Sequence, residues 1–363
     1  MSIDSKQFDA PSLLEHGGAL LAAATRYGIA REKWLDLSTG INPDAWPLPV
    51  FPAAIWSRLP EEDDGLEDAA RAYYGSAHIL PVAGSQASIQ AIPRLRDKCR
   101  VGVLDPGYAE HAVAWRRAGH RVVPVCAHQI NERVSEFDVL VLIHPNNPSG
   151  ARFGRGTLLR WLQCLAARGG WLIVDEAFMD ATPDDSLSQD CPREGLIVLR
   201  SLGKFFGLAG ARVGFVCAQP KLLARIRVLL GPWTVSSPAR LIARQALQDR
   251  LWQKAARERL SRQSLRLSSL LAQHGLKPDG GCALFQWLGT PRAAYLHEFF
   301  ARRAILSRYF EDPPGLRFGL PGSDHEWERL ERALSEIEPP CGTIDRTATL
   351  PNGQPEIQCA SSS

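Results

Sequence analysis

The chain has 363 residues, of which 45% are hydrophobic and 22% are charged. This is ordinary globular composition, and the length suggests about two to three domain-sized units. The formal net charge is only +3 and comes from well-mixed basic and acidic residues. That balance excludes the basic footprint of a dedicated nucleic-acid binder, so small molecules are the expected partners.

The first eleven residues are polar, and no apolar run reaches the roughly 18 residues that a membrane span needs. We therefore expect neither a signal peptide nor a membrane partner. The eight cysteines are scattered, with no C-x-x-C pair and no histidine at ligand spacing. We expect reduced thiols in a cytoplasmic protein, and no metal site.

Short apolar, β-branched runs alternate with helical stretches between residues 78 and 217. This rhythm is typical of an α/β domain with a largely parallel, buried sheet. Polar or small residues follow several of the runs directly. Because open α/β sheets bind ligands at the carboxyl ends of their strands, we expect a site built from the segments DPGY, HPNNPSG, DEAF and SLGK.

The second half of the chain predicts a connecting helix and a smaller α+β unit. Ser237 and Pro238 suit a helix start, and an Arg-rich amphipathic pattern then continues to Gly275. A strand-like CALFQWL, a helix over 291–303 and a strand over 316–318 follow. The expected division is an N-terminal arm with part of the small domain (1–45), a large cofactor-binding domain (46–236), a connecting helix with the small domain (237–338) and a disordered tail (339–363).

Lys204 is the first candidate for chemistry, in the segment SLGKFFGLAGARVG. It follows a strand and a Ser-Leu-Gly turn, and a second cation, Arg212, lies eight positions further on. An amine near another positive charge and shielded from water has the lowered pKa that a Schiff-base lysine needs. Taken alone, however, Lys204 is better explained as a surface lysine after a strand.

Asp175 ends the apolar run WLIVD, so its carboxylate would emerge from a buried sheet. A carboxylate against the nitrogen of a pyridine ring keeps that nitrogen protonated and makes the ring an electron sink. A helix cap at the end of the strand explains Asp175 about equally well.

Other segments supply groups for a phosphorylated aromatic cofactor. Asn147, in HPNNPSG, could donate its amide to a ring oxygen, and Tyr108, in DPGY, could stack on the ring. The backbone N–H groups near Ser85 and Gln86 would form an anion-binding helix start. A phosphate pocket is expected where Ser201 and Arg212 converge on them.

The N-P-x-G turn, the D-E-A strand end and the S-x-x-K…R-x-G signature together resemble the class I/II aminotransferase family of fold-type I pyridoxal-phosphate enzymes. The resemblance runs from His16 to about Leu334. It implies an α/β fold, with a fold-type I PLP-dependent transferase-like large domain, a mostly parallel sheet and a smaller α+β domain. It also implies pyridoxal 5'-phosphate (PLP) as cofactor and a homodimer.

Site roles are carried over by position. The resemblance implies Lys204 as the Schiff-base lysine, Asp175 on the pyridine nitrogen, Asn147 on the phenolate oxygen and Tyr108 as the stacking ring. It implies that the cofactor phosphate is held by Ser85, Gln86, Ser201 and Arg212. It implies that the substrate is held by His16, Gly17, Asn42, Arg308 and Arg317.

The segments HGG, DLSTGINP, DEAF and GPWTVSSPA are more similar to a decarboxylating branch of this family. The implied reaction converts L-threonine O-3-phosphate into (R)-1-aminopropan-2-ol O-phosphate, a step of cobalamin biosynthesis. A histidinol-phosphate aminotransferase is the first alternative, and a non-catalytic PLP-binding protein is the second. The chain departs from the family at Phe178 and at Leu59, where tyrosines are usual.

Overall fold

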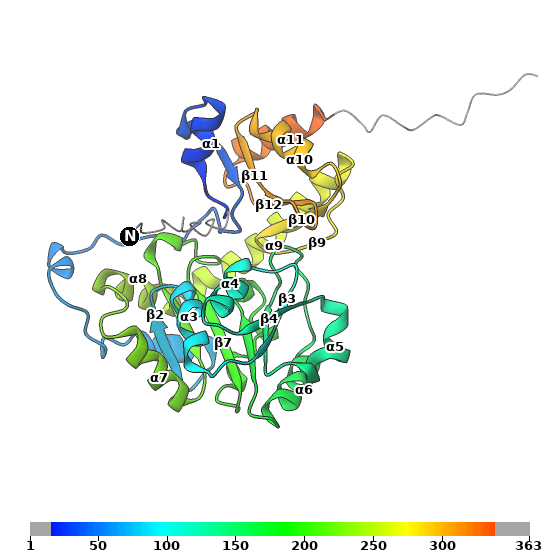
Figure 1. Cartoon of the computed structure of the whole chain (residues 1–363). Helices are drawn as coiled ribbons and strands as arrows, with labels where there is room; N and C mark the ends of the chain where they lie inside the picture. The colour runs from blue at the N-terminus through cyan, green and yellow to red at the C-terminus, as the bar shows by residue number, and fades with distance from the viewer. Residues whose placement is uncertain (1–15, 338–363) are drawn as a thin grey trace, which may run out of the picture.

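The computed structural model describes residues 16–337 and consists of two lobes, each built on one sheet (Figure 1). The strands are β1 (Leu35–Leu37), β2 (Ile79–Val82), β3 (Arg100–Leu104), β4 (Arg121–Val125), β5 (Val139–Ile143), β6 (Trp171–Asp175), β7 (Leu196–Ser201), β8 (Gly214–Cys217), β9 (Gly280–Cys282), β10 (Phe285–Gly289), β11 (Ile305–Phe310) and β12 (Gly315–Gly319). The α-helices are α1 (Leu20–Tyr27), α2 (Leu66–Tyr74), α3 (Ser85–Ala91), α4 (Ala109–Arg117), α5 (Ile130–Arg133), α6 (Arg155–Ala166), α7 (Pro220–Leu230), α8 (Ser237–Gln248), α9 (Arg250–Gln273), α10 (Ala293–Ala301) and α11 (Asp324–Ser335).

The large domain is built on a seven-stranded sheet in the order β2-β8-β7-β6-β5-β3-β4. Strands β4, β3, β5, β6 and β7 run parallel, and β8 is antiparallel to both of its neighbours. The predicted α/β fold with a mostly parallel sheet is thus confirmed.

The interior strand β5 shows that this sheet is covered on both faces. All five of its residues are buried, and successive side chains enter different cores. Val139 and Val141 pack in a core with residues of α3, α4 and α7, whereas Leu140 and Leu142 pack with residues of α2, α6 and α8. A strand that is buried on both faces has no polar alternation, which is why it reads as the continuous apolar run VLVLI.

The small domain is built on a five-stranded sheet in the order β1-β11-β12-β10-β9. Strand β1 pairs parallel with β11, and the remaining pairs are antiparallel. The N-terminal part of the chain therefore completes a sheet made mostly of C-terminal strands, in the upper lobe of Figure 1. All strands of the seven-stranded sheet lie inside 46–236 and those of the other sheet lie outside it. The domain boundaries themselves stay a prediction, and the tail from residue 339 lies outside the described residues.

The predicted single helix over 237–275 is wrong, because the chain breaks at Asp249 into α8 and α9. Asp249 has ψ 77°, which is not helical, and its side chain accepts a hydrogen bond from the backbone N–H of Trp252. It is therefore the N-cap of α9. Helix α8 packs on α2 in the large domain, and α9 packs on β10 in the small domain.

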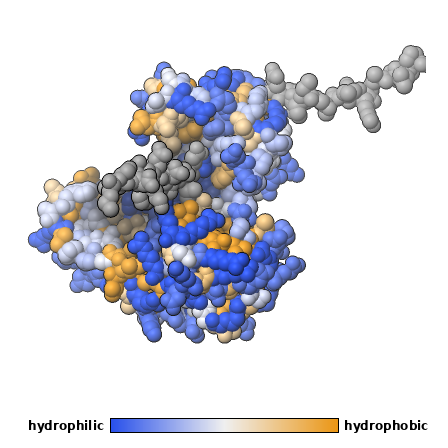
Figure 2. All heavy atoms as spheres, viewed as in Figure 1, coloured by the Kyte–Doolittle hydropathy of each residue, from blue (hydrophilic) through white to orange (hydrophobic). Residues whose placement is uncertain are grey.

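The surface is mixed in character, and in the view of Figure 2 hydrophobic residues are exposed mainly on the lobe of the large domain. No helix within residues 16–337 is both long and apolar enough to cross a membrane. The six cysteines in this part of the chain are free thiols.

Candidate active site

One cavity of about 450 Å³ receives both Lys204 and Asp175. Its floor is formed by residues that follow β3, β5, β6 and β7, at the carboxyl ends of the parallel strands. Its other wall comes from the small domain and the N-terminal segment, with His16, Gly17, Thr39, Arg308, Phe310 and Arg317. The amine and the carboxylate that the sequence assigns to one ring therefore face the same space.

Lys204 has the properties of a nucleophilic amine. Its pKa is lowered to about 8, chiefly by burial and also by the charges of Arg317 and Arg212, against the opposing effect of Asp175. The sequence pointed to Arg212, but Arg317 of β12 has the larger effect. The Lys204 Nζ atom lies 5.5 Å from the centroid of the Phe178 ring, an apolar neighbour that adds no hydroxyl group.

Asp175 is held in place by two donors. Its Oδ1 atom accepts the backbone N–H of Ala177 at 3.0 Å, and its Oδ2 atom lies 2.9 Å from Nε2 of His111. Both side chains are nearly inaccessible, with Asp175 3% and His111 2% exposed. The position at the end of β6, which also suited a helix cap, here directs the carboxylate into the cavity.

At one end of the cavity, Arg212 lies against the turn before α3. A Cβ atom on Gly84 would come within 2.6 Å of the Arg212 guanidinium, and Gly84 has a positive φ of 71°. Only glycine permits both the conformation and the approach. Ser85 follows in the first turn of α3, and Ser201 ends β7 with its hydroxyl accepting the N–H of Gly203. The structure thus brings together three of the residues predicted to hold the phosphate.

The fourth of these residues, Gln86, lines the cavity with its amide already engaged. Its Nε2 atom donates to Glu110 at 2.8 Å, and its Oε1 atom lies 3.4 Å from the Tyr108 hydroxyl. Its side chain therefore serves to hold its neighbours, and its backbone N–H is the group left for a phosphate.

Tyr108 stands on the cavity wall between two histidines. Its ring centroid lies 5.7 Å from that of His16 and 6.2 Å from that of His111. Burial, with the nearby charges of Glu110 and Asp175, raises the pKa of Tyr108 to about 12. The side chain is therefore neutral at physiological pH and suits stacking on a flat ring.

Asn147 and Arg317 form one unit across the two domains. Arg317 donates Nη1 to Asn147 Oδ1 at 2.5 Å and Nη2 to the carbonyl oxygen of Ser38 at 2.7 Å. With Oδ1 engaged, the amide Nδ2 of Asn147 is the group that can donate into the cavity. Burial, together with the charge of Arg308, lowers the pKa of Arg317 to about 10, although Cys282 and Asp36 oppose this.

The remaining predicted substrate residues divide into two sets. His16, Gly17 and Arg308 line the cavity, and the Arg308 guanidinium lies 5.0 Å from the centre of the Phe310 ring. Asn42 does not line it. Its Nδ2 atom donates to the carbonyl oxygen of Phe205, and its backbone N–H donates to the carbonyl oxygen of Lys204. Asn42 therefore supports the backbone around Lys204. Its predicted contact with the substrate stays a prediction.

Sequence reasoning missed His111 and Glu110, which contact the predicted residues from α4. A signal was present, since His111 lies three residues after Tyr108 and thus on the same helical face. Glu110 reaches His16, a residue 94 positions away, and no local pattern could have shown that contact.

The residues present fit PLP. A cavity of about 450 Å³ is within the usual range for small-molecule sites. It combines an amine of lowered pKa, a buried carboxylate, an aromatic wall, an amide donor and a guanidinium beside a glycine turn, each matching a different part of that cofactor. Within residues 16–337, no group of three or more His, Cys, Asp or Glu side chains could hold a metal ion.

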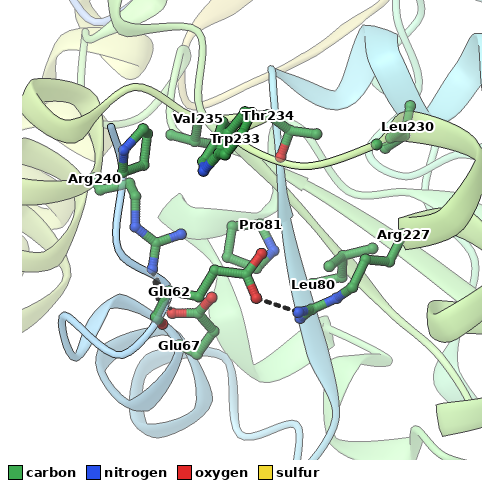
Figure 3. Close-up of a pocket in the computed structure, with 12 residues that line it drawn as sticks. Glu62, Glu67, Leu80, Pro81, Arg227, Leu230, Trp233, Thr234, Val235 and Arg240 are labelled. Carbon is green, nitrogen blue, oxygen red and sulfur yellow. Dashed lines mark hydrogen bonds and ion pairs between the residues drawn. The ribbon is translucent and has the colours of Figure 1, made fainter. Parts of the chain in front are cut away.

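A second cavity, of about 20 Å³, lies between α7, β2 and the start of α8 (Figure 3). Ion pairs surround it, between Arg227 and Glu62 and between Arg240 and Glu67. Its volume holds about one water molecule, so it is not a second substrate site.

The chain matches the family described as aminotransferase class I and II over residues 59–333. A threonine-phosphate decarboxylase of Pseudomonas aeruginosa is 54% identical over 90% of this chain and 99% of that protein. One from a Sinorhizobium species is 40% identical over 89% of this chain and 98% of that protein.

The solved structure of histidinol-phosphate aminotransferase from Sinorhizobium meliloti in complex with pyridoxal-5'-phosphate superposes with a TM-score of 0.76 at 20% identity. The match covers 92% of this chain and 98% of that one. The resemblance inferred from the sequence is thus confirmed: the chain belongs to the aminotransferase class I and II family, in the same group as the two threonine-phosphate decarboxylases.

Proposed function

We propose that the chain is a PLP-dependent carboxy-lyase that converts L-threonine O-3-phosphate into (R)-1-aminopropan-2-ol O-phosphate and carbon dioxide. The observation that carries the proposal is the single cavity shared by Lys204, Asp175, Asn147 and the two arginines Arg308 and Arg317. The 54% identity to the Pseudomonas protein, across nearly all of that protein, supports the substrate.

PLP, when bound, supplies an aldehyde that captures an amine and a protonated ring that accepts the electrons of the bond that breaks. Lys204 is the amine of the resting enzyme. Asp175, which contacts His111, would keep the ring nitrogen protonated, and the amide of Asn147, whose oxygen already accepts from Arg317, would donate to the ring oxygen. Ser85, Ser201, Arg212 and the Gln86 backbone would hold the cofactor phosphate.

The substrate carries two anionic groups, and the small domain offers two arginines and a histidine to them. Arg308, Arg317 and His16 face the cavity from that side. Holding both anionic groups would fix the rotation about the α-carbon of the substrate and so select the bond to the carboxylate for cleavage. Lys204, with a pKa of about 8, would then be able to deliver a proton to the α-carbon.

The proposal includes a homodimer in the cytoplasm and a place in cobalamin biosynthesis. Several large apolar side chains before α2 are well exposed in the single chain, and an interface would cover them: Leu48 61%, Val50 99%, Trp56 69% and Leu59 64%. Leu59 cannot supply the hydroxyl that a tyrosine would bring to a neighbouring site.

A mass-resolved assay with phosphothreonine and with histidinol phosphate tests the function. We expect carbon dioxide and the amino-alcohol phosphate from phosphothreonine, with no keto acid. Amino transfer from histidinol phosphate to a keto acid, with no carbon dioxide from phosphothreonine, would establish the rival aminotransferase instead.

A further inference from the structure

Glu110, in the first turn of α4, gathers side chains from distant parts of the chain. Its carboxylate lies 2.9 Å from Nε2 of His16 and accepts hydrogen bonds from Nε2 of Gln86 at 2.8 Å and of Gln90 at 3.2 Å. An acidic residue in a first helical turn is often a solvated surface residue that favours the helix dipole. The Glu110 side chain is only 15% exposed, so solvation does not explain it.

The segment that carries His16 is anchored to the small domain. The backbone N–H of Gly18 donates to Ser38 Oγ at 2.7 Å, and Ser38 directly follows β1. Gly17 lies so close that a Cβ atom there would be 2.3 Å from the Ser38 carbonyl oxygen. The contact between His16 and Glu110 therefore joins the small domain to α4 of the large domain at the edge of the cavity.

We propose that Glu110 is a positioning residue that orients His16 for the phosphate of the substrate, an inference that rests on the proposed function. With Nε2 held by Glu110, Nδ1 is the ring nitrogen left to donate to a phosphate oxygen. A hydrogen bond from that nitrogen to an ionised phosphate oxygen is charge-assisted, so its strength depends on how well the ring is oriented. Glu110 itself does not line the cavity, so its negative charge lies behind the imidazole ring of His16.

Glu110 contacts Gln86 as well, and this gives a competing role that experiment can separate. Gln86 lies at the end of the cavity assigned to the cofactor phosphate, whereas His16 lies on the wall assigned to the substrate. A role through Gln86 would weaken cofactor binding. A role through His16 would raise KM for the substrate and leave the bound cofactor unchanged.

The test is a double-mutant cycle on the PLP-loaded enzyme with phosphothreonine, using Glu110→Ala, His16→Ala and the double variant. We expect each single variant to raise KM about 10- to 100-fold, the equivalent of one hydrogen bond to a charged group, with kcat and the near-visible cofactor absorbance little changed. The double variant should be no worse than His16→Ala, because Glu110 acts only through that ring. Glu110→Gln, which keeps an acceptor for His16, should recover part of the loss.

Glu132→Ala, an exposed glutamate of α5, is the matched control and should behave as the wild type. Effects on KM that multiply in the double variant overturn the inference, and so does a loss of cofactor absorbance in Glu110→Ala. Both results leave the proposed function intact. A wild-type enzyme that releases no carbon dioxide from phosphothreonine overturns the proposed function, and this inference with it.

Discussion

Nε2 of His111 lies 2.9 Å from Oδ2 of Asp175, and both side chains are nearly inaccessible to solvent. An imidazole that donates a hydrogen bond to a carboxylate fixes the orientation of the carboxylate and leaves the carboxylate charged. In the proposed mechanism, His111 in the first turn of α4 therefore supports the role of Asp175 at the end of β6.

Replacement of Asp175 by Asn should test this pair. The side chain keeps its size but loses the charge that holds the ring nitrogen protonated, so we expect kcat to fall by about 100-fold or more, as when a preorganised charge partner is removed. His111→Ala should act in the same direction with a smaller loss. Steady-state kinetics of PLP-loaded protein measures both, and a His111→Ala enzyme with full kcat would show that the contact is only structural.

Lys204→Ala removes the amine to which the cofactor is expected to attach. We expect loss of the near-visible absorbance of the bound cofactor and of turnover, while thermal unfolding stays cooperative. Absorbance spectra of purified protein with added PLP measure the first effect. Unchanged activity in this variant would refute the assignment of Lys204.

Cofactor uptake should depend on pH through Lys204. Its pKa is lowered from 10.5 to about 8, so the neutral, nucleophilic amine increases as pH rises through 8. At pH 7 about one amine in ten is neutral, against about one in 3,000 for an ordinary lysine. The rate of PLP uptake by the cofactor-free enzyme should rise up to about pH 8 and then level off. A rate that keeps rising to pH 10 would mean that the lysine is unperturbed.

Gly17→Ala should damage substrate binding through backbone displacement. A Cβ atom would lie 2.3 Å from the Ser38 carbonyl oxygen, so the segment bearing His16 must move. We expect KM for phosphothreonine to rise about 10-fold or more, since a charged hydrogen bond is misplaced. Gly154→Ala is the control, because nothing lies within 4 Å of a Cβ atom there. Equal KM values for the two variants would contradict the proposed role of the segment.

The fold and the floor of the site could be predicted because each depends on local patterns. The buried runs that end at Leu104, Ile143 and Asp175 are strands, and the residues after them meet at one edge of the sheet. The family signature then supplied roles for Lys204 and Asn147.

Contacts between distant segments could not be predicted in this way. The pairing of Arg317 with Asn147 spans 170 positions, and that of His16 with Glu110 spans 94. The break at Asp249 was missed because an aspartate inside a helical pattern looks like a surface residue until its capping bond is seen. The larger effect of Arg317 on Lys204 likewise depends on how the two domains meet.

The most direct test of the central claim is the reaction of phosphothreonine in D₂O. If Lys204 and Asp175 act on one cofactor to break the bond to the carboxylate, the product is 1-aminopropan-2-ol phosphate with one deuterium on the carbon that lost carbon dioxide, and no keto acid forms. Formation of a keto acid with the carboxylate retained would contradict the account.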